Sequence, residues 1–168
     1  MRIAVLSDSH DNIWKVEAAM DHLLMADVVV HCGDLCSPFM LQQLADGVKE
    51  KPVHIVWGNN DGDKLLMART AAERPWVHLH GAFAQLNLGG LAVGVNHYPE
   101  LARGLASTGK YQLVCYGHDH TAHQEWVGEC LLLNPGELMG LKGRSSLAVV
   151  ETTTREVQKI DLGPMAAR

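Results

Sequence analysis

Five short apolar runs of the chain are each followed by side chains that can bind a metal ion. The segments that follow them are Asp8-Ser9-His10, Gly33-Asp34, Gly58-Asn59-Asn60-Asp61, Asn96-His97 and Gly117-His118-Asp119-His120. Short apolar runs of this kind are typical of buried strands. Open α/β sheets place their sites beyond the carboxyl ends of such strands. The order therefore predicts that carboxylate, amide and imidazole groups meet at one common sheet edge.

The spacing within these segments suits metal binding. Asp8 and His10 are two residues apart just past a strand, so both side chains can face the same cation. The pair His118 and His120 repeats this spacing and is the most specific of the motifs. Asp34 follows a glycine at which the backbone can turn sharply, and its two carboxylate oxygens can bridge two cations.

One amide oxygen joins the candidate ligands, and several other residues have an ordinary structural explanation. The carbonyl of Asn59 suits a hard divalent ion. Taken singly, the Asp34 and Asn59 segments also fit ordinary turns and helix starts. His78-x-His80 has the form of a ligand pair but lies inside an alternating segment, so we interpret it as a surface strand face. His31 ends a strand and is expected to pack or to support the site, and no pattern supports a site role for His22, His54 and His123.

Strands and helices that must position these side chains alternate in the first 75 residues. Apolar periodicity predicts strands at 2–6, 27–31 and 53–57 and helices at 12–25, from Ser37-Pro38 onward and after Asp61-Gly62-Asp63. Asp11 is placed to cap the first helix. Repeated strand–helix units of this kind predict a parallel sheet.

The second half of the chain is richer in strands. Alternation over 77–88 and a Gly89-Gly90 turn before the run 91–95 predict an antiparallel section. A helix is expected at 99–106, and further strands at 113–116, 122–127, 130–133, 146–151 and 156–161. Two packed sheets with helices outside would accommodate both halves. We expect one domain over residues 1–168, with a loose tail at 163–168.

Composition narrows the class of protein. The net charge is −5, and the Lys and Arg residues are scattered, so we expect neither a nucleic-acid partner nor a membrane surface. The four cysteines form no Cys-x-x-Cys pair, which favours reduced thiols. Without a signal peptide or a long apolar segment, the expected location is cytoplasmic.

In this order, the motifs resemble those of the calcineurin-like metallophosphoesterases. The motifs are Asp8-x-His10, Gly33-Asp34, Gly58-Asn59-x-Asp61, His97 and Gly117-His118-x-His120, and the chain length is similar to that of small YfcE-type phosphodiesterases of bacteria and archaea. The resemblance extends from Met1 to about Asp161. It implies an α/β fold, a four-layer α/β/β/α sandwich of two mixed sheets.

The resemblance also implies a centre with two divalent metal ions. One ion would be held by Asp8, His10, Asp34 and His120, and the other by Asp34, Asn59, His97 and His118, with Asp34 as the bridge. Asp61 would orient a ligand or the neighbouring backbone. Mn²⁺ is the metal most expected, with Fe, Zn²⁺ or Ni²⁺ as alternatives, because the ligands are nitrogen and oxygen without thiolate.

The implied activity is phosphoester hydrolysis, most of all of small phosphodiesters. In this family a hydroxide that bridges the two ions attacks phosphorus in line, and Asp34, Asn59, Asp61 and His97 are the residues expected to carry catalysis. The alternatives are a phosphomonoesterase or nucleotide phosphatase, and a non-catalytic scaffold of the same fold. A homodimer or higher homo-oligomer is a further expectation.

Four positions depart from the family pattern. Asn60 stands where larger relatives carry a histidine that can protonate the leaving group, so leaving groups of low pKa should be favoured. Asn96 precedes His97, the least secure of the ligands. Asp119 and Glu137 replace a frequent Thr and Ser, and they are expected to weaken affinity for strongly anionic monoesters. Asn134-Pro135-Gly136 is expected to form a turn at the rim of the site.

Overall fold

The computed structural model describes residues 1–164 and contains two packed β-sheets with helices on both outer faces. The six-stranded sheet has the order β11-β10-β1-β2-β3-β4. Its strands are β1 (Arg2–Leu6), β2 (Val28–His31), β3 (Val53–Ile55), β4 (Val77–Leu79), β10 (Ser146–Glu151) and β11 (Val157–Asp161). Strands β1 to β4 pair in parallel, whereas β10 and β11 pair antiparallel, so the sheet is mixed.

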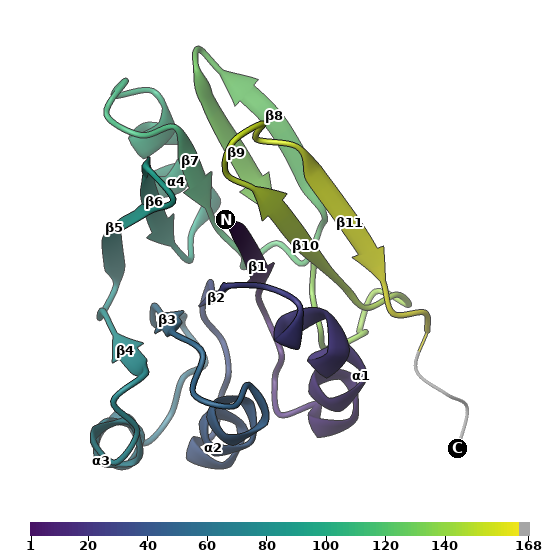
Figure 1. Cartoon of the computed structure of the whole chain (residues 1–168). Helices are drawn as coiled ribbons and strands as arrows, with labels where there is room; N and C mark the ends of the chain where they lie inside the picture. The colour runs from purple at the N-terminus through teal and green to yellow at the C-terminus, as the bar shows by residue number, and fades with distance from the viewer. Residues whose placement is uncertain (165–168) are drawn as a thin grey trace.

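The five-stranded sheet is also mixed and has the order β5-β6-β7-β9-β8. It consists of β5 (Phe83–Leu88), β6 (Leu91–Asn96), β7 (Leu113–Cys115), β8 (His123–Val127) and β9 (Cys130–Asn134). β6, β7 and β9 pair in parallel, and β5 and β8 pair antiparallel at the two edges. The four-layer α/β/β/α sandwich implied by the sequence is confirmed (Figure 1).

The helices begin close to their predicted positions: α1 (Ile13–Leu24), α2 (Pro38–Gly47), α3 (Lys64–Ala72) and α4 (Pro99–Ala106). Ser37 caps α2 as expected, since its side chain accepts a hydrogen bond from the Met40 N–H. The expected cap of α1 is wrong: the Asn12 side chain accepts from the Lys15 N–H. Asp11 instead accepts two hydrogen bonds from Ser37, which joins the starts of α1 and α2.

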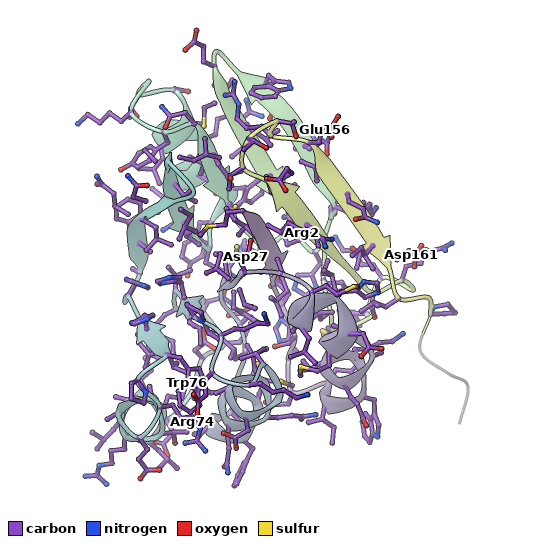
Figure 2. All side chains as sticks on the ribbon, in the orientation of Figure 1. Arg2, Asp27, Arg74, Trp76, Glu156 and Asp161 are labelled. Carbon is purple, nitrogen blue, oxygen red and sulfur yellow. The ribbon has the colours of Figure 1, made fainter. Side chains whose placement is uncertain are left out.

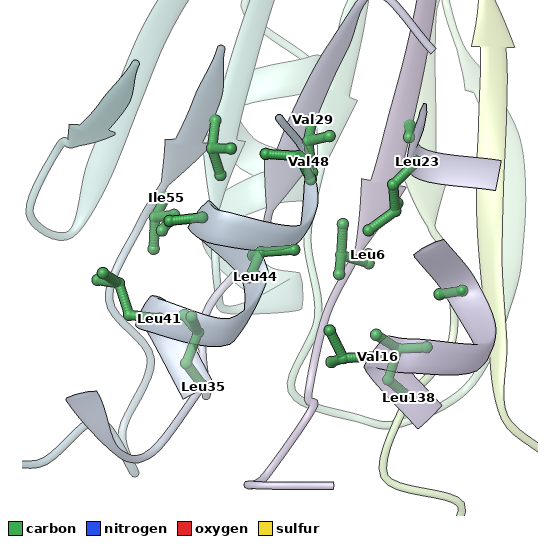
Figure 3. Close-up of a cluster of buried hydrophobic side chains, with 14 of the residues drawn as sticks. Leu6, Val16, Leu23, Val29, Leu35, Leu41, Leu44, Val48, Ile55 and Leu138 are labelled. Atoms are coloured by element: carbon green, nitrogen blue, oxygen red, sulfur yellow. The ribbon is translucent and has the colours of Figure 1, made fainter. Parts of the chain in front are cut away.

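Three apolar clusters hold the layers together. Helices α1 to α3 pack on the six-stranded sheet, where Leu6, Val29 and Ile55 meet Leu23 and Leu44 (Figure 3). Between the sheets, the alternate residues of β1 and β2 pack against β6, β7 and β9. Helix α4 covers the outer face of the five-stranded sheet. Burial on both faces explains why these central strands are near-continuous apolar runs.

The antiparallel section predicted from the segments 77–88 and 91–95 is confirmed in part, since β5 pairs antiparallel with β6. The alternating segment 77–88, however, contains two strands in different sheets, because β4 adds in parallel to β3. The chain crosses between the sheets at residues 80–82, where Gly81 has a φ of 73°. Alternating apolar residues occur on both sides of this crossing, so their period cannot reveal the change of sheet.

The edge that contains β4 is fixed to α2 by two side chains that follow α3 (Figure 2). The Trp76 Nε1–H donates to the Ala45 carbonyl oxygen at 3.0 Å. Arg74 pairs with Asp46, with Nε 2.7 Å from the carboxylate. These contacts hold the short edge strand in register.

The end of the described chain contacts helix α1. Lys15 Nζ donates to the carbonyl oxygens of Leu162, Gly163 and Pro164 at 2.9–3.0 Å. The rest of the tail predicted at 163–168, from residue 165 onward, lies outside the described residues. Within residues 1–164, none of the helices has the length and apolar character needed to cross a membrane.

Candidate metal centre

Tight turns at the strand ends bring the predicted ligands together. Asp8, His10, Asp34, His118 and His120 all have positive φ, between 40° and 73°. Only a few per cent of non-glycine residues adopt this conformation, which Asp and His tolerate better than most, and residues held in it cluster at functional sites. The backbone conformation at these strand ends therefore directs the ligand side chains toward one another.

Asp8, His10 and His120 form one group of converging ligand atoms. Oδ1 of Asp8 lies 3.8 Å from Nε2 of His10 and 3.3 Å from Nε2 of His120. Asp8 is completely buried, whereas both imidazoles are partly exposed. The group thus forms a cradle with its carboxylate at the base and its imidazoles at the opening.

Asp34 lies between the group of Asp8, His10 and His120 and a second group that contains His97. Its Oδ2 is 3.5 Å from Nε2 of His10 and 3.5 Å from Nε2 of His97. Asp8, Asp34 and His97 also form a second converging group, all three of them buried. The two groups therefore share Asp8, and the Asp34 oxygen touches an imidazole from each.

Asn59, His97 and His118 complete the other half. Oδ1 of Asn59 is 3.1 Å from Nε2 of His97 and 2.9 Å from Nδ1 of His118. The His118 N–H also donates to Oδ2 of Asp8, which ties the two halves together. The structure therefore brings all seven predicted metal ligands into one place, including His97, the least secure of them.

Hydrogen bonds on the far ring nitrogens orient two of the imidazoles. Nδ1 of His97 is 2.8 Å from the Cys32 carbonyl oxygen, so Nδ1 carries the proton and the Nε2 lone pair faces Asp34 and Asn59. Nδ1 of His10 is 3.3 Å from Sγ of Cys36. Burial raises the pKa of that thiol to about 12, so Cys36 stays protonated. Sequence reasoning missed Cys36, which carries no recognisable motif.

Two buried polar atoms in the cradle have no hydrogen-bond partner among the described residues. They are Oδ1 of Asp8 and Nε2 of His10. A buried polar atom without a partner costs about 1–3 kcal/mol, so proteins rarely leave one without a function. Both atoms face the same space, and a carboxylate oxygen with an imidazole nitrogen is a donor set for a divalent cation. The residues present therefore fit a metal ion.

The acidic residues of the centre stay ionised. Burial raises the pKa of Asp34, but the His97 side chain and two hydrogen bonds from Asn60 lower it far more, to well below its usual value. Asp8 follows the same pattern, since burial is outweighed by the neighbouring His10 and Ser7 side chains and its pKa is lowered. Both carboxylates are thus available as anionic ligands at neutral pH.

Asp61 holds the loop that carries Asp34. Its Oδ2 accepts from the backbone N–H groups of Asp34 and Gly58, and its Oδ1 accepts from Leu35 and Cys36. These distances are 2.7–3.0 Å. Asp61 therefore orients the backbone around a ligand, as the sequence predicted.

Asn60 contacts the same carboxylate directly. Its backbone N–H donates to Oδ1 of Asp34 and its side-chain Nδ2–H donates to Oδ2, both at 2.7 Å. The residue that departs from the family pattern thus orients Asp34. The sequence pointed only to the missing acid and gave no sign of this contact.

Glu137 lies directly behind His120. Its Oε2 is 2.5 Å from Nδ1 of His120, and its Oε1 accepts from the Lys142 backbone N–H. The side chain is 1% exposed. A carboxylate in this position fixes the ring orientation of a ligating histidine and raises its basicity. Its contacts give Glu137 a role in orienting His120, and its expected effect on the affinity for anionic monoesters stays a prediction.

The turn at Asn134 supports the loop that carries His118 and His120. The Asn134 Nδ2–H donates to the Gly117 carbonyl oxygen and to Oδ1 of Asp119. Asp119 also accepts from the Thr121 backbone N–H, so its carboxylate braces the loop. The prediction that Asn134 shapes the rim of the site is consistent with these bonds.

Glycine is required where the loops meet. A Cβ on Gly117 would lie 1.9 Å from Oγ of Ser7 and 2.6 Å from Oδ2 of Asp8. A Cβ on Gly58 would lie 2.1 Å from Oδ1 of Asp34. Such distances are far inside van der Waals contact, so the backbones of these loops approach the carboxylates only because the side chains are missing.

The remaining histidines lie away from the centre or beneath it. His31 is fully buried, and its Nε2 is 3.1 Å from Oγ of Ser9, which agrees with the packed, supporting role predicted. His78 and His80 lie at β4 beside His54 and contribute nothing to the two converging groups.

Curated proteins of similar sequence point to phosphoesterases. Phosphodiesterase MJ0936 of Methanocaldococcus jannaschii is 26% identical over 167 residues, which cover 96% of this chain and 99% of that protein. The probable metallophosphoesterase YsnB of Bacillus subtilis is 28% identical over 144 residues, with 82% and 75% of the two chains covered.

Solved structures share the fold. An archaeal phosphodiesterase superposes with a TM-score of 0.89 at 25% identity, over 96% of this chain and 99% of that chain. YfcE, a phosphoesterase from E. coli, has a TM-score of 0.64 at 16% identity, over 97% and 100% of the two chains. The second likeness shows the fold alone.

The family model of the calcineurin-like phosphoesterase superfamily domain matches residues 1–155. This range contains every ligand of the centre described above. The geometry and the match lead to the same conclusion: the chain belongs to the calcineurin-like phosphoesterase superfamily.

Proposed function

We propose that the chain is a metal-dependent phosphodiesterase that binds two divalent metal ions at this centre and hydrolyses small phosphodiesters. One observation carries the proposal. The seven predicted ligands converge, and among their atoms Asp8 Oδ1 and His10 Nε2 are buried without a hydrogen-bond partner in the described residues. The diester preference is supported by the name phosphodiesterase, which both the similar archaeal sequence and the similar archaeal structure carry.

The proposed ligand sets follow from the contacts. Asp8, His10 and His120 hold one ion, and Asn59, His97 and His118 hold the other, with Asp34 between them. The donors are nitrogen and oxygen without thiolate, which suits Mn²⁺ and Fe at least as well as Zn²⁺. Mn²⁺ is our choice for reconstitution.

The protein's own residues set up an in-line displacement at phosphorus. Bound divalent cations supply the Lewis acidity that lowers the pKa of water and offsets the charge developing on the phosphoryl group. Asp61 and Asn60 fix Asp34 in place before substrate arrives, so no reorganisation is needed during the reaction. No serine or cysteine nucleophile is required in this scheme.

The leaving group must depart as an anion, because Asn60 cannot protonate it. Asn60, the residue at the position of the family's acid, has its amide committed to Asp34 and cannot release a proton at neutral pH. Esters with leaving groups of low pKa, such as aryl phosphodiesters, are therefore the proposed good substrates. The physiological substrate class remains a small phosphodiester, and a homo-oligomer remains a prediction.

The test compares a diester with its matched monoester. Protein stripped with a chelator and reloaded with Mn²⁺ is assayed on bis-aryl and mono-aryl phosphates bearing the same leaving group. We expect activity to disappear on stripping, to return with Mn²⁺, and to be higher on the diester. A higher rate on the monoester would assign a phosphatase instead. Failure to bind Mn²⁺ would favour the non-catalytic scaffold.

A further inference from the structure

Three histidines outside the metal centre lie together at the open edge of the six-stranded sheet. His54 on β3 is the direct neighbour of His78 on β4, and His80 follows two residues later. Val53 and Ile55 pack in the helix-covered core, so His54 projects from the opposite face of the sheet. The three rings therefore share one face, the side on which the chain crosses to the five-stranded sheet.

Two of the imidazole nitrogens are already close to the separation that a common metal ion requires. Nδ1 of His54 lies 2.9 Å from Nε2 of His80. Two nitrogens that each bond one Zn²⁺ at about 2.0–2.1 Å in tetrahedral geometry are about 3.3 Å apart, so a small outward movement of the two rings would admit the ion. The hydrogen bond between them uses one ring proton, and a shift of that proton to the other nitrogen of its own ring frees both lone pairs.

The third imidazole is close and free to turn. The ring centroid of His78 is 4.8 Å from that of His54 and 6.4 Å from that of His80. His78 is exposed, so rotation about its side-chain bonds costs little. Within the described residues, groups of three converging ligand atoms occur only at the metal centre, so the His78 side chain must rotate toward His54 and His80 to supply a third ligand at the edge.

The electrostatic surroundings favour neutral imidazoles. Burial, together with the neighbouring imidazoles of His78 and His80, lowers the pKa of His54 to about 4. The pKa of His80 is lowered by burial and by His78. Both rings are therefore unprotonated at neutral pH, the form that binds a metal.

The backbone that carries the cluster is held in place. The His80 N–H donates to the Ile55 carbonyl oxygen at 2.9 Å, which extends the pairing of β4 with β3. Trp76 and Arg74 anchor the other end of β4 to α2. The backbone is therefore fixed, and the main reorientation on metal binding is that of the His78 side chain, which keeps the loss of conformational freedom small.

We propose that His54, His78 and His80 form a second metal site, separate from the phosphoesterase centre, for a divalent transition metal such as Zn²⁺. The ligand set is imidazole only, which suits Zn²⁺, Cu²⁺ and Ni²⁺ and disfavours Mg²⁺ and Ca²⁺. An ion bound there clips the edge strand β4 to β3 and braces the crossing between the sheets.

The test counts zinc ions in the whole protein. Stripped wild type and His80→Gln are each saturated with Zn²⁺, and bound zinc per chain is measured after removal of free metal. We expect His80→Gln to bind one zinc ion fewer than wild type. This difference does not depend on how many ions the phosphoesterase centre holds. His22→Gln, which removes a histidine of α1, is the matched control and should bind as many ions as wild type.

Two further measurements guard against a folding defect. His78→Gln changes only an exposed side chain, and it should weaken Zn²⁺ binding at the edge by more than about tenfold, since loss even of an outer partner of a ligand costs that much. Added Zn²⁺ should also raise the Tm of wild type more than that of either edge variant. Equal zinc content and equal Tm increments in wild type and both variants would overturn the proposal.

Discussion

The chain gathers histidines into two clusters with opposite electrostatic character. At the metal centre the Asp8 carboxylate raises the pKa of His10. Burial lowers the pKa of His97, but the Asp34 carboxylate more than offsets this and raises it. At the sheet edge, burial and neighbouring imidazoles lower the pKa of His54 and His80.

The difference shows that neighbouring charge, and not residue type, sets the chemistry of a histidine cluster. Carboxylates at the centre supply anionic oxygen ligands and can balance two divalent cations. The edge cluster offers only neutral nitrogens and suits a single borderline metal. Four changes can break or sharpen this contrast.

The largest effect is expected from Asp34→Asn, which removes the anion between the two halves of the centre. Activity on an aryl phosphodiester should fall by more than about 100-fold, because loss of a supporting partner alone costs about 10- to 100-fold. Steady-state rates and bound Mn²⁺ measure this. Asp46→Asn removes a surface carboxylate paired with Arg74 and should leave activity unchanged. Full activity in Asp34→Asn would show that catalysis does not need the Asp34 carboxylate.

Glu137→Gln should have the next largest effect. The variant keeps an oxygen near Nδ1 of His120 but loses the buried charge behind the ring, so Mn²⁺ affinity should fall by about 10- to 100-fold. Equilibrium dialysis measures the affinity. The matched control is Glu125→Gln, which removes a carboxylate 3.2 Å from the exposed His123 and should not alter Mn²⁺ binding. A similar loss in both variants would deny Glu137 a special role.

Gly117→Ala tests how tightly the centre is packed compared with the open edge. The new methyl group would meet Ser7 and Asp8, and overpacking of this kind costs about 1–3 kcal/mol. Thermal unfolding and Mn²⁺ affinity should both decline. Gly104→Ala lies in α4 with nothing within 4 Å of the new Cβ, so its Tm should be unchanged or higher. A wild-type Tm in Gly117→Ala would show that the loops can move apart to admit the methyl group without loss of stability.

The smallest effect concerns His54 and acid. Its pKa is about 4 in the folded protein and about 6.5 when unfolded, so between these values the unfolded chain binds more protons. Stability is therefore lost as the pH falls from about 6.5 to 4. With a discount for the partly exposed ring, His54→Gln should reduce that loss by about 1 kcal/mol, or about 2–4 °C in Tm.

This measurement is made in the presence of a chelator, so that metal release does not contribute. His22→Gln is again the control. Parallel Tm curves for wild type and His54→Gln between pH 6.5 and 4.5 would contradict the lowered pKa.

The local pattern of the chain was enough to place most of the centre. Each ligand follows an apolar strand, and parallel strands end at a common edge, so Asp8, Asp34 and His118 could be assigned without coordinates. The same pattern located the helices and most strands within a few residues. It predicted the antiparallel pairing across Gly89-Gly90 but missed the change of sheet within 77–88, because a period of two continues unchanged where the chain passes from one sheet to the other.

The sequence by itself thus determined which residues could bind metal and in which order the strands deliver them. Only the tertiary structure decided that Glu137 supports His120 and that Asn60 holds Asp34. It also brought His54, to which no sequence pattern assigned a site role, next to His78 and His80. The physical reason is distance along the chain. Periodicity is a property of neighbours, whereas the contact between Asp8 and His118 spans 110 residues and exists only once both sheets have packed.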